Sequence, residues 1–351
     1  MMSKRKESWQ LLRGVCIIAV VACHVPGFFS IDNGVTNYYF YLLIRQLVSF
    51  CVPVFLFVSG FFSGGGYKNS AYLNNRFKKL IIPYVEWTTI YVLLNCFMSF
   101  RAGAKINVKE ILYDYLLGRA TAPLYYIIVL LQFIMITPLL AKIVKENGIL
   151  SKVLWLITPL YLAIMYGYIL LNGAYPKSYN VWVFGWFSFY YLGLYCRIQP
   201  DSIKNTVKRI GHSSIIIITF LFCVFEAAIA TALKLNPGYI MNQMKISSML
   251  FSLALCIYFY KMIEILGKTE VPTFFGVLKW VGDNSYGVFY VHELVKVFVV
   301  AICSRTINAG PILFVAEWLI CVFVSALFVE LCRLMCDKLN VTSPLLRTWI
   351  Q

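Results

Sequence analysis

The sequence predicts an all-α, polytopic membrane protein with about ten transmembrane helices, and its composition is the main reason. Of the 351 residues, 60% are apolar and only 13% are charged, and the mean hydropathy is +0.75. A soluble domain has about 45–50% apolar and about 25% charged residues, so a water-soluble globule is excluded. Aromatic residues make up 17%, which suits a protein with aromatic belts at the two membrane interfaces.

Ten segments are long and apolar enough to span the bilayer, because a span needs about 20 mostly apolar residues. The first segment follows a basic start without a small-residue cleavage signal, so we expect a retained span and no removed signal peptide. Several segments begin or end at Gly, Pro or Asn, and 181–197 is short. The predicted spans are 11–31, 37–63, 80–99, 123–143, 152–171, 181–197, 214–233, 243–266, 285–304 and 311–336.

The distribution of basic residues predicts the topology of these spans. With the N-terminus in the cytoplasm, 20 of the 31 Lys and Arg residues fall in cytoplasmic segments and 8 in outside segments. The positive-inside rule therefore favours ten spans with both termini cytoplasmic. It also explains the net charge of +16 without a nucleic-acid partner. The sizeable loops are expected at 100–122, 198–213 and 267–284, and residues 1–351 are expected to form a single membrane domain with no extra soluble domain.

The 11 cysteines lie mostly within apolar runs and form no Cys-x-x-Cys pair. This pattern is typical of small buried side chains and not of a disulfide framework. The histidines in the predicted spans have no Cys, His or Asp partner at metal-ligand spacing. We therefore expect no metal.

Arg13 and His24 are the clearest candidates for a functional pair, since ionisable residues in spans are costly. Eleven residues turn a helix about 20° past three full turns and advance it about 16 Å. Both side chains therefore share one face, with Arg13 at the cytoplasmic boundary and His24 well across the bilayer. The alternative is that Arg13 extends to the lipid headgroups and His24 lies in the outer interface.

Two further groups of polar residues follow along the chain. Ser59-Gly60 near the end of the second span allows a helix or ligand to approach closely, and the three glycines at 64–66 predict a cytoplasmic loop. The basic residues after them can bind phosphate groups, or can simply be a flexible loop with positive-inside charge. These basic residues are Arg76, Lys78 and Lys79.

The remaining candidates lie in the third and ninth spans. Glu86 is either interfacial or paired with Arg13 or Arg45. Ser285, Phe289, His292 and Lys296 recur at intervals of four, three and four residues, which places them on one helical face. A Glu293–Lys296 ion pair is sufficient to explain those two residues, and His292 is left as a second histidine in the bilayer.

In combination, these residues resemble the acyltransferase-three family, integral membrane enzymes that O-acylate bacterial cell-surface glycans. The most specific element is the Arg–His spacing in the first span, and the order of the other elements along the chain supports it. The resemblance rests on Arg13-x10-His24, Phe55-x-x-x-Ser59-Gly60, the basic stretch leading into Ile82-Pro83-Tyr84, and Asn284-Ser285-Tyr286 through His292.

The resemblance implies an acyl-CoA donor, acetyl-CoA by default, that binds from the cytoplasm. The implied acceptor is a surface glycan or lipid-linked oligosaccharide, and the implied location is the bacterial inner membrane. It would make His24 the catalytic base, Arg13 a partner in the donor channel, and Ser59-Gly60 part of the cavity wall. The family's Arg-x-x-Arg appears as Arg76-x-x-Lys79. The lysine keeps the positive charge but lacks a guanidinium, which can donate two parallel hydrogen bonds to one phosphate.

The chemistry of the residues fits acyl transfer. A base near neutral pKa is needed to activate an alcohol, and no Gly-x-Ser-x-Gly nucleophile motif is present. Direct transfer with His24 as base is the simpler hypothesis, and a covalent acyl-His stays open. Two other classes also stay open: a transporter or flippase for a glycan or small solute, and a glycan polymerase, although the longest outside loop is modest for a polymerase.

Overall fold

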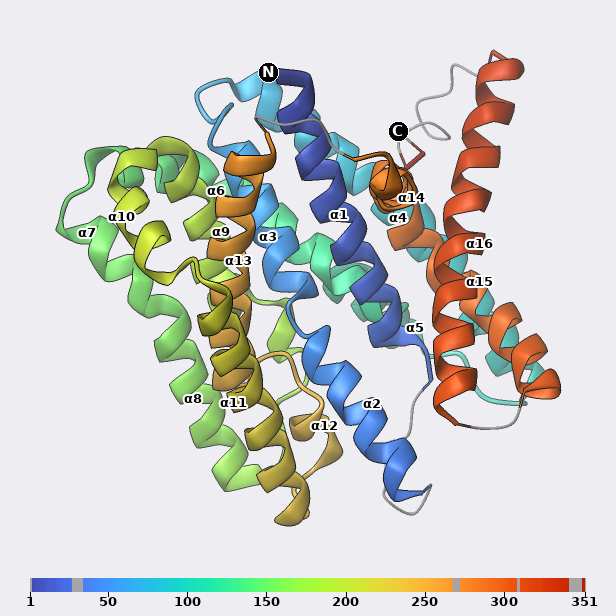
Figure 1. Cartoon of the computed structure of the whole chain (residues 1–351). Helices are drawn as coiled ribbons and strands as arrows, with labels where there is room; N and C mark the ends of the chain where they lie inside the picture. Colours follow the sequence, from blue (N-terminus) through green and yellow to red (C-terminus); the bar gives the residue numbers. More distant parts are fainter. Residues whose placement is uncertain (1, 27–33, 268–271, 308–309, 341–348, 351) are drawn as a thin grey trace.

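The computed structural model describes residues 2–26, 34–267, 272–307, 310–340 and 349–350, and these residues form helices and no strands. The helices lie roughly side by side in one bundle (Figure 1). Their bounds are α1 Met2–His24, α2 Val35–Leu47, α3 Cys51–Ser63, α4 Ser70–Arg101, α5 Val108–Leu117, η2 Ala122–Leu124, α6 Tyr125–Glu146, α7 Ile149–Val153, η3 Leu154–Leu156, α8 Ile157–Asn172, η4 Tyr179–Val181, α9 Val183–Ile198, α10 Pro200–Ile210, α11 Ser213–Ala232, α12 Pro237–Ile240, α13 Ile246–Leu266, η5 Thr273–Phe275, α14 Gly276–Asp283, α15 Ser285–Thr306 and α16 Pro311–Lys338.

The all-α membrane architecture is confirmed. Within the described residues, eight helical stretches are long and apolar enough to cross a membrane, and they match eight of the ten predicted spans. The other two, 11–31 and 181–197, correspond to α1 and α9. Helix α9 has 16 residues, or about 24 Å at 1.5 Å per residue, against a hydrocarbon core of about 30 Å. The count of ten stays a prediction, and residues 27–31 lie outside the described residues.

The outer faces of the bundle are apolar, as a lipid-facing surface requires. Leu170 and Leu171 at the end of α8 are 85% and 87% exposed, and α4, α11, α15 and α16 also expose large apolar side chains. Both chain ends lie at the same end of the bundle (Figure 1), which agrees with an even number of crossings. Their cytoplasmic location remains the prediction of the charge distribution.

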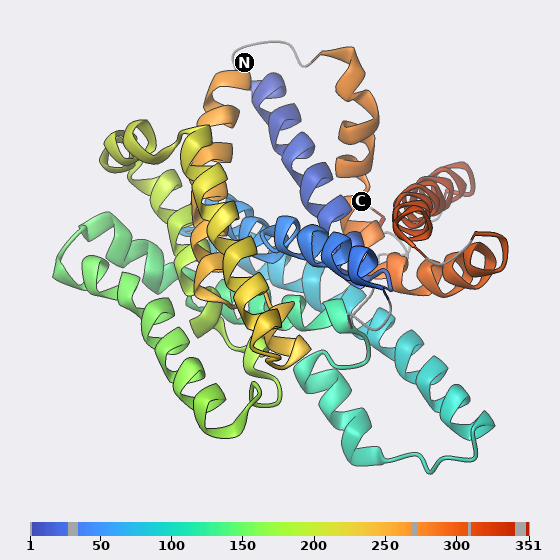
Figure 2. The same cartoon turned by 60° about the horizontal axis from the view of Figure 1, so that its bottom comes forward.

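The three stretches expected to be loops do connect longer helices, and each contains a short helix among its described residues that was not predicted from the sequence. Helix α5 lies in 100–122, α10 in 198–213 and α14 in 267–284. Local signals explain two of them: the side chain of Asn107 accepts a hydrogen bond from the Lys109 backbone N–H at 3.0 Å, and α10 starts with Pro200, the residue favoured at a first helical position. Helix α14 packs against α1 (Figure 2).

The second predicted span, 37–63, is broken into α2 and α3 at residues 48–50. Pro53 is the physical reason, because its ring lacks an N–H and clashes with the carbonyl four residues earlier. Proline is tolerated in the first turn of a new helix, which is where α3 has it. The break places α3 in the centre of the bundle, between α1 and α9.

Helices α3 and α9 approach each other closely because each has a glycine at the contact. A Cβ atom on Gly60 would collide with the backbone of Tyr190, and one on Gly193 would collide with the backbone of Phe57. Small residues at membrane helix interfaces let backbones meet in this way. Gly60 therefore has a packing role that fixes α3, the helix carrying Phe55 and Ser59.

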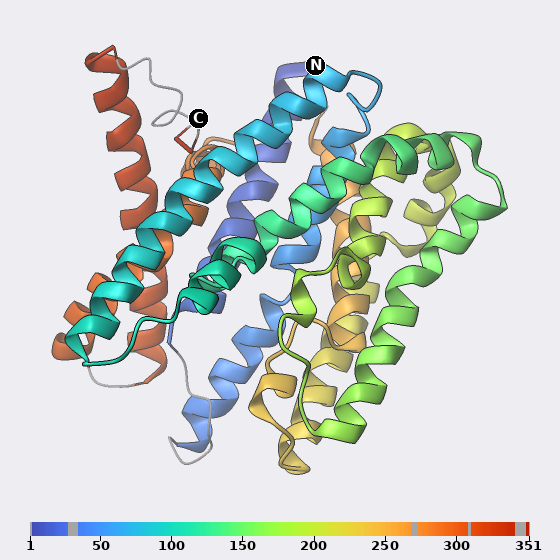
Figure 3. The same ribbon diagram turned by 180° about the vertical axis from the view of Figure 1, so that it is seen from behind.

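Helix α4 begins ten residues before its predicted start at 80 and crosses the back of the bundle along its full length (Figure 3). The side chain of Asn69 caps it by accepting a hydrogen bond from the Tyr72 backbone N–H at 3.1 Å. The basic stretch expected in a loop is therefore helical. This correction matters for the site, because a helix assigns each basic side chain to a definite face.

Candidate active site

A cavity of about 390 Å³, called here the basic cavity, lies between α1, α3, α4, α6 and α15. Arg13, Arg76 and Lys79 line it, together with Ser59 and Ser285. No carboxylate is among its lining residues in the described part of the chain. Three cations without a lining carboxylate make this cavity attractive to an anionic ligand.

The helical start of α4 explains which basic residues reach the basic cavity. Arg76 and Lys79 are three residues apart and share a face, and both line the cavity. Lys78 is exposed and lies outside the set of lining residues. The guanidinium of Arg76 donates a hydrogen bond to the Ser63 hydroxyl, which fixes α4 to the end of α3.

Arg13 and Ser59 line the basic cavity, whereas Gly60, the other member of the Ser-Gly pair, does not. Arg13 donates to Gln10 Oε1 at 3.0 Å, and its guanidinium lies 5.3 Å from the centre of the Phe62 ring. Ser59 lines the basic cavity. Gly60 packs against α9 and does not belong to the lining residues of that cavity, so within the pair only the serine can contact a ligand there.

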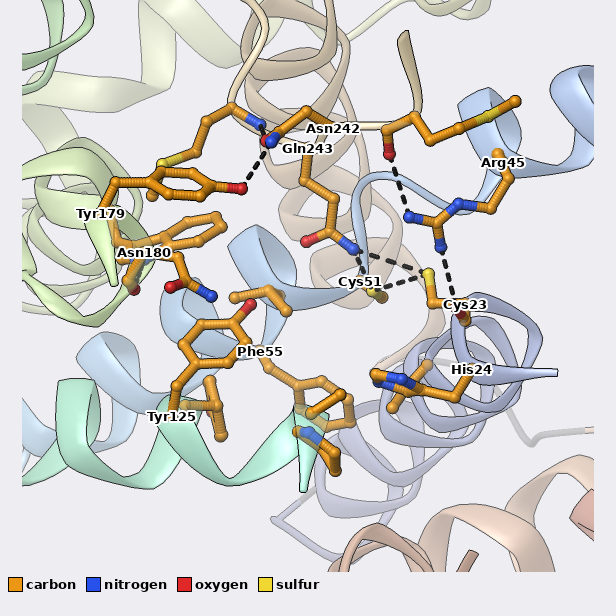
Figure 4. A pocket seen from close by; sticks show the side chains of 18 of the residues that line it. Cys23, His24, Arg45, Cys51, Phe55, Tyr125, Tyr179, Asn180, Asn242 and Gln243 are labelled. Atoms are coloured by element: carbon orange, nitrogen blue, oxygen red, sulfur yellow. Dashed lines mark hydrogen bonds between the residues drawn. The ribbon is translucent and has the colours of Figure 1, made fainter. Parts of the chain in front are cut away.

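A second cavity of about 330 Å³, called here the histidine cavity, is lined by His24 at the end of α1. Further polar lining residues come from distant parts of the chain and include Arg45 of α2, Asn180 beside α9, and Gln243 between α12 and α13. Figure 4 shows these side chains around one space, with His24 and Arg45 on one side and Tyr179 opposite. The cavity thus presents hydrogen-bonding groups and aromatic rings together.

His24 faces the carboxylate of Glu293. The His24 Nδ1 atom lies 3.4 Å from Glu293 Oε1. The other carboxylate oxygen accepts a hydrogen bond from Lys296 Nζ at 2.7 Å and one from the Thr121 hydroxyl at 3.2 Å. Glu293 is 9% exposed, and the two hydrogen bonds hold its carboxylate against the imidazole. The expected Glu293–Lys296 ion pair is present, but the carboxylate also contacts both histidines.

His292 is fully buried behind His24, and their ring centres are 5.3 Å apart. Its Nδ1 lies 2.9 Å from the Val288 carbonyl oxygen, so that nitrogen carries the proton. Its Nε2 atom is 3.6 Å from Glu293 Oε1 and has no hydrogen-bond partner. Glu86 is half-buried and belongs to the lining of neither cavity among the described residues.

No cluster of metal-ligating residues was predicted from the sequence, but the fold brings three such residues together. Ligand atoms of His24, His292 and Glu293 all lie within 4.8 Å of one another. The fold creates this cluster by placing the end of α1 beside α15, which spacing along the chain cannot reveal. Because Lys296 already neutralises Glu293 at 2.7 Å, the donor set is that of a hydrogen-bonded and ion-paired network, and the expectation of no metal stays a prediction.

Several residues of the histidine cavity were missed by the sequence analysis. Arg45 donates to the carbonyl oxygens of Cys23 at 3.2 Å and Met241 at 3.0 Å, and its buried Nε has no partner. Gln243 donates to the sulfur atoms of Cys23 and Cys51 at 3.5 and 3.4 Å, while its buried Oε1 has no partner. Buried polar atoms without partners are rare, so a ligand in this cavity would satisfy them.

Tyr179 adds a neutral hydroxyl to the same cavity. Its ring stacks on Tyr175 with centres 4.3 Å apart, and its hydroxyl accepts a hydrogen bond from the Asn242 amide. Burial raises the pKa of the Tyr179 phenol, so the group stays protonated. Besides His24, Arg45 was a sequence signal for this cavity, as a charged residue inside a predicted span that was considered from the sequence only as a candidate partner of Glu86.

The comparison with protein families settles the classification. A family model described as "Acyltransferase domain", that of the acyltransferase-three family, matches residues 6–332. The chain belongs to this family. The resemblance found in the sequence motifs is therefore confirmed over nearly the whole chain, and both cavities lie within the matched region.

Relatives of this acyltransferase-three protein are known by name. The chain is 25% identical over 244 residues to the "Probable poly-beta-1,6-N-acetyl-D-glucosamine export protein" of Staphylococcus aureus (strain MRSA252), covering 64% of this chain and 66% of the relative. It is 26% identical over 208 residues to the protein of that name from strain MSSA476, covering 56% and 57%. The chain thus spans less than two thirds of these relatives. No solved structure matches.

Proposed function

We propose that this protein is a membrane O-acyltransferase of the bacterial cytoplasmic membrane. It moves an acyl group, acetyl by default, from cytoplasmic acyl-CoA to a sugar hydroxyl of a surface polysaccharide or its lipid-linked precursor. The observation that carries the proposal is the His24–Glu293 pair beside a cavity, next to a second cavity lined by cations. The family supplies the reaction class.

The 3.4 Å separation of His24 Nδ1 and Glu293 Oε1 supports the roles of a general base and a residue that positions it. We assign the proton to Nδ1, which faces Glu293 Oε1, an oxygen that has no hydrogen-bond partner among the described residues. The imidazole then presents Nε2 as an acceptor, as in other carboxylate-oriented histidine bases. Nε2 takes the proton from the sugar hydroxyl while that oxygen attacks the thioester carbonyl. When the carbon–sulfur bond breaks, the imidazolium returns the proton to the CoA sulfur. The positive charge that forms on His24 is stabilised by Glu293.

The basic cavity suits the donor. The phosphate groups of CoA are polyanionic, and Arg76 and Lys79 offer cationic hydrogen-bond donors on one face of α4. Arg13 lines the same cavity from α1, and the eleven-residue spacing places it on the same helical face as His24. The histidine cavity suits the acceptor, because its amides, phenol and guanidinium match a hydroxyl-rich sugar.

The experiment measures transfer of radiolabelled acetyl from acetyl-CoA into the glycan fraction of membranes. Alkali-labile label is expected with wild type, and a loss of about 10²–10⁴-fold with His24→Ala, the range for removal of a general base. His212→Ala is the matched control, because His212 is exposed at the start of α11 and lines neither cavity. Near wild-type transfer by His24→Ala, in protein present at normal level, would refute the assignment.

Export is the second candidate, because the relatives carry that name. An exporter moves the glycan across the membrane when no acyl-CoA is supplied, whereas an acyltransferase leaves label on the glycan. Glycan movement that persists in the His24→Ala protein without acyl-CoA, combined with no label from acetyl-CoA or succinyl-CoA in wild type, would favour the exporter.

A further inference from the structure

The basic cavity and the histidine cavity share three lining residues, all aromatic. Phe55 comes from α3, Tyr126 from α6 and Phe289 from α15, and each lines both cavities. The centres of the Phe55 and Tyr126 rings are 6.2 Å apart, and those of Tyr126 and Phe289 are 5.6 Å apart. These are contact distances for aromatic pairs, so the three rings, called here the ring wall, separate the two cavities.

The ring wall differs chemically from what lies on either side. Cations line the basic cavity, and His24 with several amides lines the histidine cavity, while the wall itself offers rings and one phenol. A charged phosphate or a hydrated sugar loses its hydrogen bonds on entering such a wall. A short acyl chain loses little, so it is the part of the donor that the wall admits most readily.

Phe55 and Phe289 are not equally confined. Phe289 is 7% exposed, and it also lies 6.5 Å from His292, measured between ring centres. Phe55 is only partly buried, so part of its ring surface is free of neighbouring atoms. The ring wall therefore combines one buried ring next to the histidines with one partly exposed ring.

We propose that the acyl group reaches His24 between the rings of the ring wall and is held there during transfer, and that the bulk of Phe55 and Phe289 sets the longest acyl group that fits and is transferred. The inference rests on the proposed acyl transfer. CoA stays on the side of Arg76 and Lys79, and the thioester carbonyl enters between the rings. The sugar oxygen forms its bond to the carbonyl carbon there, the bond to sulfur breaks, and the hydroxyl proton passes through His24 to the sulfur.

The test compares a series of acyl-CoA donors of increasing chain length, from acetyl to octanoyl, and records the longest group transferred. Phe55→Leu and Phe289→Leu are expected to extend the series and to raise relative transfer of the first excluded length by about tenfold or more, as one methylene in an apolar pocket discriminates. The matched control is Phe57→Leu, since Phe57 lies two residues along α3, is fully buried and lines neither cavity. It is expected to keep the wild-type series.

An unchanged series in both active variants would overturn the ring-wall proposal, as would the same extension in Phe57→Leu. If the leucine variants fail to accumulate in the membrane, Phe55→Trp decides the question: it must shorten the series, and an unchanged series refutes the proposal. A wild-type protein that transfers no acyl group from any donor would instead refute the proposed function. The two failures are thus distinguishable.

Discussion

The two cavities are built in opposite ways. The basic cavity carries Arg13, Arg76 and Lys79 with no carboxylate among its described lining residues, so its positive charge is available to a ligand. Around His24 the charge is balanced, because Glu293 lies between the two histidines and Lys296. The difference fits the proposed binding of an anionic ligand by charge in the first cavity and the proposed orientation of a base in the second.

This contrast also separates the expected consequences of mutation. Removing a cation from the basic cavity weakens attraction for an anionic ligand, which affects binding. Removing a group from the network around His24 is expected to disturb the proposed base in the transition state, which would affect the catalytic rate. The following predictions test that division, in order of decreasing effect.

The largest effect after loss of His24 itself is expected for Glu293→Gln. The change keeps the shape but removes the charge that stabilises the imidazolium, so kcat should fall by about 10²-fold with KM for acyl-CoA nearly unchanged. Steady-state transfer kinetics measure both. Glu330→Gln is the matched control, because Glu330 also pairs with a cation three residues along its helix, Arg333, at 3.0 Å. An equal fall in kcat in both variants would show that Glu293 has only a structural role.

A smaller effect is expected when the charge of the basic cavity is removed. The double variant Arg76→Gln with Lys79→Gln should raise KM for acyl-CoA by about tenfold, in line with the loss of charge-assisted hydrogen bonds, and leave kcat within a few-fold. Lys78→Gln should behave as wild type because Lys78 is exposed and outside the cavity. A lower kcat with an unchanged KM would contradict the assignment of donor binding to the basic cavity.

The smallest effect is expected for Gln243→Ala. Its unpartnered Oε1 would lose one hydrogen bond to the acceptor, which raises KM for the acceptor glycan by about 2–12-fold for a bond worth about 0.5–1.5 kcal/mol. KM for acyl-CoA should stay constant. Gln199→Ala provides the control, since Gln199 donates to the Lys145 carbonyl at 3.2 Å and lines neither cavity. A raised KM for acyl-CoA in Gln243→Ala would place the donor in the histidine cavity.

Local periodicity accounts for the parts of the site that the sequence predicts well. Arg13 and His24 lie on one continuous helix, α1, as their spacing requires. The basic stretch was placed in a loop because three glycines precede it, although Asn69 is a strong helix cap. That capping signal was present in the sequence. The helix that it starts places Arg76 and Lys79 on the cavity face and Lys78 on another face.

Composition and helical spacing alone determined the membrane setting, most of the spans and the family motifs, because lipid burial and the helix repeat act on residues close together in the chain. Only the tertiary structure placed Glu293 beside His24 and joined Phe55, Tyr126 and Phe289 into one wall. Those contacts join helices that are distant in sequence. They depend on how helices pack, which here follows from close contacts such as that of Gly60 and Gly193 with the opposing backbones.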